Sequence, residues 1–271
     1  MKRIEDLEVE KIDKRREKRK KSEWLRAIES VFDGYTLKAL YDLIDFGSEE
    51  IKGMDFRGVI SSGKEANVYY ALSPKGEELA IKIYRTVAVE FKRMEAYIIG
   101  DPRFKKRRKS THALIYDWAR KEFANLTKME EVGVRVPRSI ELKRNVLVME
   151  FIGEDGLAAP LLKDSPPETY EEAEKLFKTL IGFVKTLYNK ASLVHADLSE
   201  WNIMMFNGPV IIDVSQSVLK PHPNAEIFLL RDLKNLLRYF SRIGLEDLPS
   251  LEELYEEITG NRPSEKDLFE V

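Results

Sequence analysis

The sequence predicts an α+β fold in two lobes, a sheet-rich lobe with one main helix followed by a reduced helical lobe. Three short segments rich in Val, Ile and Tyr, at 55–61, 66–72 and 78–84, are separated by turn residues, as in an antiparallel meander. A long stretch with helical spacing follows at 113–132, and helical spacing dominates again after Pro167. These two halves predict a cleft between the lobes.

The chain before the meander is predicted to be helical. Residues 1–22 have the composition of a solvated arm, and the basic run KRREKRKK lies at 14–21. From Ser22, a plausible N-cap, apolar residues recur at helical spacing, and a second helix is expected over 36–46, ending at Gly47. We therefore expect extra N-terminal helices in front of the sheet.

A polar and basic insert at 85–111 joins the meander to the main helix. Its middle, GDPRFKKRRKST, shows no apolar period, so it is expected to bury no face and to be mobile. Six basic residues at 103–109 would attract RNA phosphates.

The remaining elements follow from period and turn residues, and Asn207-Gly208 predicts a hairpin turn. Further strands are expected at 138–143, 146–151, 192–195, 202–206 and 209–213, and further helices at 168–191, 225–243 and 250–259. We divide the chain into an arm with N-terminal helices (1–48), an N-lobe with the basic insert (49–152) and a reduced C-lobe (153–271).

Composition excludes several classes of protein. The 271 residues include no cysteine, which excludes a disulfide scaffold, a thiolate zinc site and a thiol nucleophile. The 43% hydrophobic content excludes a disordered chain. No stretch approaches the roughly 20 apolar residues that span a bilayer, and the N-terminus is charged rather than a signal peptide. We expect a cytoplasmic protein that does not contact membranes.

The segment ISSGKEANV at 60–68 lies between two predicted strands. Backbone N–H groups in a Gly-containing turn can approach phosphate oxygens, because Gly has no Cβ in the way. An ordinary hairpin turn is the alternative. GVISSGK at 58–64 also has the spacing of a Walker A loop, but Glu65 stands where Ser or Thr should bind Mg²⁺, and a strand follows instead of a helix.

Lys82, in LAIKIY, is predicted to face the interior of the meander together with Ala80. An isolated buried ammonium is costly, so such a lysine needs an anionic partner. A phosphate and Glu122 on the main helix are the two candidates. The alternative is a surface lysine whose stem alone is buried.

The strongest local signal is LVHADLSEWNIMMFNGPVIIDV at 193–214. Asp197, Asn202 and Asp213 lie among apolar runs, where they could supply oxygen ligands to a hard cation such as Mg²⁺ and leave one carboxylate to position a nucleophile. Ordinary turn hydrogen bonds are the alternative. His195 is more simply read as structural, because nothing in this chemistry needs a histidine proton.

Together these motifs resemble those of the RIO atypical protein kinases, of the branch without a winged-helix domain (RIO1-like). The resemblance rests on SSGKEANVYYA, AIKIYR, DWARKEFANL, VMEFIG, LVHADLSEWNIM and IIDVSQ, and runs from about Gly34 to Gly244. It implies a bilobal protein-kinase-like fold.

The resemblance also implies roles. Asp197 would accept or orient the attacking hydroxyl, Asn202 and Asp213 would bind Mg²⁺ (Mn²⁺ being an alternative cation), and Lys82 would hold the α and β phosphates of ATP and pair with Glu122. The phosphate loop would be Ser61, Ser62, Gly63, Lys64 and Glu65. The adenine would meet a hinge and the sheet at Met149, Glu150, Ile152, Ile60, Val68 and Ala80.

The departures from ordinary protein kinases are informative. The phosphate loop has Ser61 and Ala66 in place of two glycines, the catalytic loop reads His-Ala-Asp without the usual arginine, and no Ala-Pro-Glu signal follows Asp213. The part after Asp213 is too short for the helical subdomain that docks peptides. The nucleotide chemistry is therefore expected to be present without the usual protein-substrate platform.

The resemblance implies a serine/threonine protein kinase with ATPase activity. It also implies that Asp213 can become an aspartyl-phosphate and that the partner is a pre-small-ribosomal-subunit particle, met as rRNA or ribosomal protein through the basic runs 14–21 and 103–109. A small-molecule kinase of the aminoglycoside or choline type shares the Asp-x4-Asn loop, but would need an acidic pocket in a larger C-lobe. An RNA-binding scaffold would not need Lys82, Asp197, Asn202 and Asp213 together.

Overall fold

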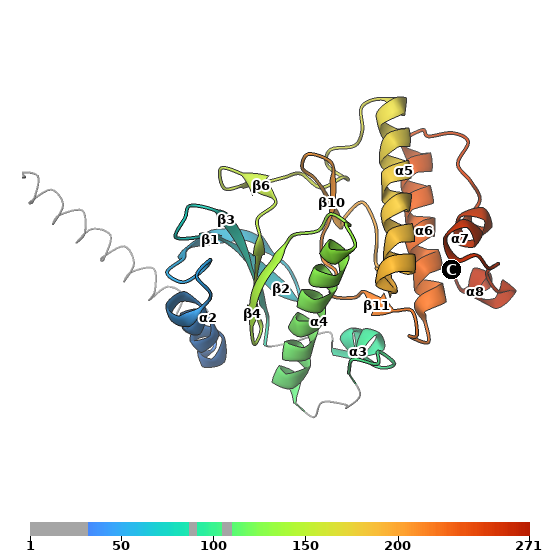
Figure 1. Cartoon of the computed structure of the whole chain (residues 1–271). Helices are drawn as coiled ribbons and strands as arrows, with labels where there is room; N and C mark the ends of the chain where they lie inside the picture. Colours follow the sequence, from blue (N-terminus) through green and yellow to red (C-terminus); the bar gives the residue numbers. More distant parts are fainter. Residues whose placement is uncertain (1–31, 87–90, 105–109) are drawn as a thin grey trace, which may run out of the picture.

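A five-stranded antiparallel sheet forms the N-terminal lobe of the computed structural model, which describes residues 32–86, 91–104 and 110–271 (Figure 1). The sheet order is β1-β2-β3-β5-β4. The strands are β1 (Asp55–Ser62), β2 (Ala66–Leu72), β3 (Glu78–Tyr84), β4 (Ser139–Lys143) and β5 (Val146–Glu150). The meander predicted at 55–84 is therefore present, and the β4–β5 hairpin completes the sheet.

Helix α2 (Gly34–Phe46) covers one face of this sheet. It begins after Asp33, whose carboxylate accepts hydrogen bonds from the N–H groups of Tyr35 and Thr36, and it ends at Gly47. Its buried side chains pack with alternate sheet residues in one apolar core, formed among others by Ala39, Leu40, Leu43, Leu79, Ile81, Ile83 and Val148. The helix that was predicted to begin at Ser22 lies outside the described residues.

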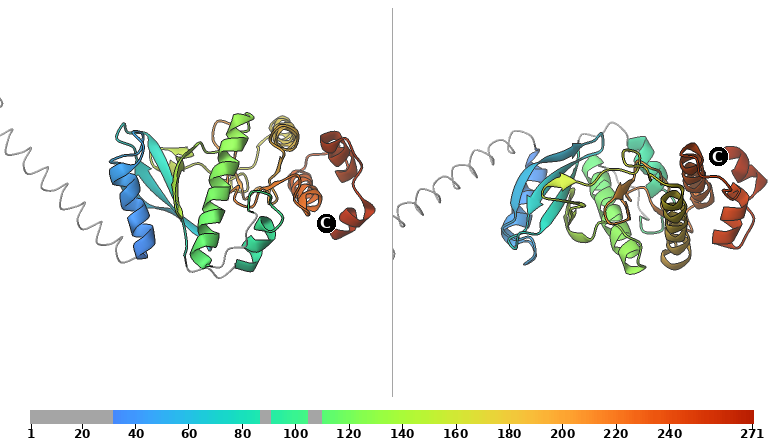
Figure 2. Two further views of the ribbon diagram at one scale, coloured as in Figure 1. Left: turned by 60° about the horizontal axis from the view of Figure 1, so that its bottom comes forward. Right: turned by 90° about the horizontal axis from the view of Figure 1, so that it is seen from above.

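Helix α4 (Thr111–Glu131) covers the opposite face. Residues 80, 82 and 84 of β3 point to this side, because side chains alternate along a strand, and Trp118 of α4 packs against Tyr84. Further along α4, Leu126 and Met129 belong to the core of the C-terminal lobe. Figures 1 and 2 show α4 standing between the sheet and the helices of that lobe.

The C-terminal lobe is helical and small. It contains α5 (Tyr170–Thr186), the π-helix η1 (Leu187–Ala191), α6 (Ala225–Arg242), α7 (Leu251–Thr259) and α8 (Glu265–Glu270). Capping boxes start α5 at Thr169 and α7 at Ser250. After β5 the chain also forms three short antiparallel pairs, namely β6 (Gly153–Glu154) with β7 (Leu157–Ala158), β8 (Leu193–Val194) with β11 (Val218–Leu219), and β9 (Ile203–Met205) with β10 (Pro209–Ile211).

The predicted fold class is confirmed. The insert at 85–111 also contains an element that the sequence does not predict, helix α3 (Phe91–Ile98), which lies before the GDPRFKKRRKST stretch. Met94 and Ile98 of α3 pack in one core with Trp118 of α4. Two apolar residues one helical turn apart are enough to dock a short helix, although they are too few to stand out in a basic stretch. Residues 87–90 and 105–109 of the insert lie outside the described part.

In the part of the chain that the structure describes, no helix combines the length and apolar character needed to cross a membrane.

Candidate active site

A cavity of about 520 Å³ opens between the sheet and the C-terminal lobe, within the size range of sites for small ligands. Strands β1, β2, β3 and β5, helix α4 and the β9–β10 hairpin all contribute to its wall. Most of the predicted site residues line it, namely Ile60, Ser61, Gly63, Glu65, Val68, Ala80, Lys82, Glu122, Met149, Glu150, Ile152, Asn202 and Asp213. Segments far apart in the sequence therefore meet at one pocket.

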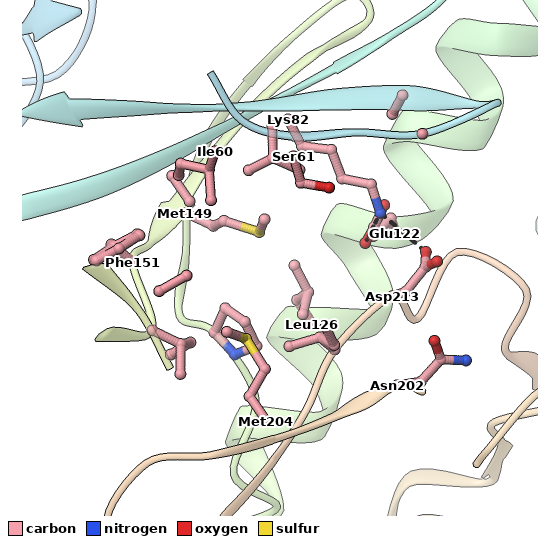
Figure 3. A pocket seen from close by; sticks show the side chains of 18 of the residues that line it. Ile60, Ser61, Lys82, Glu122, Leu126, Met149, Phe151, Asn202, Met204 and Asp213 are labelled. Carbon is pink, nitrogen blue, oxygen red and sulfur yellow. Dashed lines mark hydrogen bonds and ion pairs between the residues drawn. The ribbon is translucent and has the colours of Figure 1, made fainter. Parts of the chain in front are cut away.

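At one end of this pocket, Lys82 of β3 links the sheet to helix α4 and to the C-terminal lobe. Its ammonium lies 2.8 Å from Oε1 of Glu122 and 3.0 Å from Oδ1 of Asp213 (Figure 3). The Lys82 side chain is 11% exposed, that of Glu122 1%, and that of Asp213 46%. Lys82 therefore has the anionic partner that burial demands, and the exposed one of its two carboxylates faces the cavity.

The charges of these three groups depend on one another. Burial alone would lower the pKa of Lys82, but Asp213 and Glu122 outweigh it and raise the pKa above its ordinary value. Burial raises the pKa of Glu122 to about 7 against the opposing effect of Lys82. The Lys82 ammonium lowers the pKa of Asp213. Lys82 is therefore a cation and Asp213 an anion at neutral pH, as binding to phosphate and to a metal cation requires.

The β9–β10 hairpin brings Asn202 and Asp213 together. Asn207 and Gly208 form its turn with φ of 54° and 118°, and positive φ at both central residues is typical of a tight hairpin turn. Asn202 precedes β9 and Asp213 follows β10, and the N–H of Ile212 donates to the carbonyl oxygen of Asn202. The predicted turn thus explains why two residues eleven positions apart line one wall.

The donor set fits a magnesium ion. The Asn202 amide nitrogen donates to the backbone and carboxylate oxygens of Asp197, so the carboxamide oxygen remains as a ligand atom. Asp213 adds a partly exposed carboxylate. Mg²⁺ is usually held by one or two carboxylates together with substrate phosphates, and no cluster of three or more His, Cys, Asp or Glu side chains suited to a metal occurs among the described residues. Asn202 and Asp213 would therefore hold the cation only together with the nucleotide.

Asp197 lies beside the cavity, and a buried acid on α6 holds its loop. Asp232 is 1% exposed, and its carboxylate accepts hydrogen bonds from the N–H groups of Ala196 (2.8 Å) and Leu198 (2.7 Å), on either side of Asp197. Ala196 has a φ of 71°, which is unfavourable for a residue with a side chain. The sequence reasoning missed Asp232, although an acid among the leucines of α6 is a detectable signal.

Burial raises the pKa of Asp197, and the charge of Asp213 adds to the effect. A carboxylate with a raised pKa is a better proton acceptor than an ordinary one. His195, two residues earlier, is 2% exposed, and burial lowers its pKa to about 4. It is therefore neutral at pH 7 and buried, as expected for a structural residue.

The other end of the cavity is apolar. Ile60, Val68, Ala80 and Met149, which the resemblance assigns to the adenine, line it. Among the apolar lining residues that the sequence reasoning missed are Leu126 of α4 and Met204 and Ile212 of the β9–β10 hairpin. Leu126 and Met204 are visible below the sheet in Figure 3. This apolar end is a suitable wall for a planar base, next to the charged end at Lys82.

Two residues of the predicted phosphate loop do not line the cavity. The Ser62 hydroxyl donates to the Asn67 side chain at 2.9 Å, and Lys64 is exposed. Gly63 makes the turn, its N–H donating to the carbonyl of Ala66, and a Cβ there would lie only 3.0 Å from that oxygen. Ser61, Gly63 and Glu65 are therefore the residues of this loop that line the cavity.

Comparison with known proteins agrees with this geometry. The RIO domain family model matches residues 67–254, well over half of the chain. The chain belongs to the RIO domain family. The match includes Lys82, Glu122, Asp197, Asn202 and Asp213.

Relatives of this RIO-family chain are named as kinases. It is 37% identical to the RIO-type serine/threonine-protein kinase Rio1 of Haloferax volcanii, over 97% of this chain and 91% of that protein. It is 40% identical to Rio1 of Methanocaldococcus jannaschii, over 89% of this chain and 80% of the relative. These names place the chain on the RIO1-like branch and support a protein-kinase phosphotransferase.

Solved Rio2 kinase structures from Chaetomium thermophilum share the fold. One has a TM-score of 0.56 at 25% identity and covers 78% of this chain and 66% of that chain. Another, described as an ADP/Mg²⁺-phosphoaspartate complex, has the same TM-score at 24% identity and covers 78% of this chain and 65% of that chain.

Proposed function

We propose that this RIO-family chain binds ATP with Mg²⁺ and transfers the γ-phosphoryl group, either to a serine or threonine hydroxyl or, through hydrolysis, to water. The observation that carries the proposal is the convergence of Lys82, Glu122 and Asp213, from three separate elements, at the charged end of a cavity whose other end is apolar. Base and phosphates would fit these two ends.

In this proposal the chain's own residues position the reactants. Lys82 holds the α and β phosphates, and Glu122 keeps its ammonium in place. Asn202 and Asp213 would hold the cation, which would neutralise charge on the phosphates. Asp197 orients the attacking hydroxyl and accepts its proton. The bond from this oxygen to the γ-phosphorus forms as the bond to the β–γ bridging oxygen breaks, and ADP leaves.

An ATPase route through Asp213 is the second form of the same chemistry. A carboxylate oxygen of Asp213 would attack the γ-phosphorus, ADP would leave, and water would then hydrolyse the acyl phosphate to regenerate the carboxylate. Two observations favour it. Nearly half of the Asp213 side chain is exposed at the cavity, and the description of one Chaetomium Rio2 structure names a phosphoaspartate.

The expected partner is a pre-small-ribosomal-subunit particle, as the family resemblance implies. The support in this chain is the charge of its basic runs, of which 14–21 and 105–109 lie outside the described residues. Arg103, from the start of the second run, is bound to Asp101 by a salt bridge of 2.6 Å. We therefore narrow the proposed RNA contact in this run to 105–109, and exclude Arg103 from it.

Neutralising the five basic residues at 105–109 while keeping Arg103 tests this contact. Binding to the precursor should weaken and lose part of its salt dependence, with ATP affinity unchanged. Normal binding across a salt series would remove the run from the interface.

Incubation with γ-labelled ATP and Mg²⁺ tests the proposed function itself. Label that is stable to acid on the protein or an added substrate indicates phosphoserine or phosphothreonine, whereas label lost in hydroxylamine indicates an acyl phosphate. Asp213→Asn should abolish the hydroxylamine-labile label, whereas a buried control such as Val194→Ala should retain it. Absence of both label and released phosphate, with the protein folded, would contradict the proposal.

A further inference from the structure

The backbone just after Asp213 is held by side chains of α4. The Lys121 ammonium donates to the carbonyl oxygens of Ser215 (2.8 Å) and Ser217 (2.6 Å). The Asn125 amide nitrogen donates to the carbonyl oxygens of Val214 (2.7 Å) and Ser217 (3.1 Å). Three carbonyls within four residues are thus bound by two side chains one helical turn apart.

The basic insert completes this contact from the other side. Arg103 donates from Nη1 to the Asn125 carboxamide oxygen at 2.7 Å, which fixes the orientation of the amide. Its other nitrogens bind both carboxylate oxygens of Asp101, at 2.9 and 2.6 Å, and the Asp101 side chain is fully buried. A bidentate pair of this kind holds the guanidinium in one geometry.

Such an arrangement is costly unless it is complete. Lys121 is 0% exposed and Asn125 is 0% exposed, and a buried polar group without a partner destabilises the folded state. Burial lowers the pKa of Lys121 well below its ordinary value, but a neutral amine would still donate the two hydrogen bonds to the carbonyls. The geometry therefore holds in either protonation state.

The loop that these side chains bind is strained at the residue of interest. Asp213 has a φ of 56°, in the left-handed region that is unfavourable for a residue with a side chain and persists only where its surroundings fix it. The bonds from α4 fix the next residues of the chain. Glu122, which holds Lys82, is the immediate neighbour of Lys121, so one helix holds both partners of the Lys82–Asp213 contact.

We propose that Lys121, Asn125 and Arg103 form a polar clamp of positioning residues, which sets the orientation of the Asp213 carboxylate through the carbonyls of residues 214, 215 and 217. The inference deepens the proposed function and rests on it for the role of Asp213. It gives the insert a definite part in the site, because the Arg103 end of the insert must be docked for the clamp to be complete.

Lys121→Met and Asn125→Ala are the test variants. Arg120→Met is a matched control, since Arg120 is the adjacent residue of α4 and has an exposed side chain, which pairs with the buried carboxylate of Asp117. Met129→Ala, in the buried core of the same helix, controls for loss of stability. ATP affinity is measured by calorimetry over a Mg²⁺ series and in EDTA, and hydrogen exchange is followed at the Ser217 amide, which donates to the carbonyl of Val214.

Each test variant should raise the Mg²⁺ concentration for half-maximal tight ATP binding by about tenfold, as expected for one or two lost hydrogen bonds. Affinity in EDTA should stay within about twofold, and Ser217 should exchange faster. Arg103→Lys keeps the positive charge but loses the bidentate guanidinium contact, so it should shift the Mg²⁺ series and the Ser217 exchange rate by less than the test variants do. Both controls should leave the Mg²⁺ series and the Ser217 amide unchanged.

A Mg²⁺ series and a Ser217 exchange rate that match those of Arg120→Met would overturn the clamp. If Lys121→Met does not fold, Asn125→Ala decides alone. If the unaltered chain binds no ATP under any condition, the proposed function fails. Hydrogen exchange then still tests the clamp. Unchanged protection of the Ser217 amide in Asn125→Ala would show that other contacts hold the loop at residues 214–217.

Discussion

His195 should make this protein sensitive to mild acid without taking part in catalysis. Its imidazole is 2% exposed, and burial lowers its pKa from 6.5 to about 4. A depressed pKa means that the unfolded chain binds the proton more tightly than the folded chain. The contribution of His195 to stability is therefore fully present above pH 6.5 and is lost as the pH falls toward 4.

The size of this loss follows from the two pKa values. A shift from 6.5 to about 4 corresponds to a loss of about 2 kcal/mol at pH 5 and about 3 kcal/mol at pH 4, relative to neutral pH. His195→Leu cannot take up a proton, so it should be free of this loss. Any cost of fitting leucine into the core is the same at every pH.

The assay is urea unfolding, followed by circular dichroism, for both proteins between pH 7.5 and 4.5. Subtracting one stability curve from the other removes the contributions of other groups, including Glu122, whose raised pKa acts in the opposite direction. The difference should move in favour of His195→Leu by about 2 kcal/mol between pH 7 and 5. Val194→Ala, a neighbouring apolar change, should show a constant difference. A constant difference for His195→Leu as well would refute the reasoning.

Three further predictions concern the site and the sheet lobe. Lys82→Met should lower turnover at saturating ATP by at least about a hundredfold, because the ammonium stabilises phosphate charge in a partly desolvated cleft. Lys82→Arg should lose turnover as well. Normal steady-state turnover in these variants would contradict the role of Lys82 in phosphate binding. Asp232→Ala should lower the free energy of unfolding by about 2–4 kcal/mol in urea and reduce turnover, because two buried N–H groups lose their acceptor. Unchanged stability together with unchanged turnover would show that other contacts hold the Asp197 loop. Asp33→Ala should lower stability by about 1–2 kcal/mol through loss of the α2 cap, with ATP affinity measured by calorimetry unchanged.

Much of the architecture follows from local pattern. The meander is predicted because alternation and turn residues specify strands and their connections. The cost of burying a charge predicts an anionic partner for Lys82, and Glu122 is one of the two candidates that it leaves. The Asn207-Gly208 turn likewise anticipates the hairpin that brings Asn202 to Asp213.

The parts that were missed depend on contacts distant in sequence. Helix α3 is held by Met94 and Ile98 against Trp118, so its stability lies in a surface that its own sequence does not show. Asp232 finds its partners in the backbone of residues 196 and 198. The distinction between Ser61, at the cavity, and Ser62, bonded to Asn67, depends on the conformation of one turn. The sequence predicts that Arg103 is available to bind RNA, but its guanidinium donates hydrogen bonds to Asp101 and Asn125.

The division of work between Asp197 and Asp213 is the central claim, and calorimetric titration of ATP with Mg²⁺ into Asp197→Asn and Asp213→Asn tests it most directly. Asp213 touches Lys82 and faces the cavity with Asn202, whereas Asp197 lies beside the cavity and is bound to Asn202. Asp197→Asn should bind ATP with Mg²⁺ within about threefold of the unaltered protein while turnover stops. Asp213→Asn should lose the Mg²⁺-dependent part of the affinity, by about tenfold or more. Equal losses of affinity in the two variants would contradict this division.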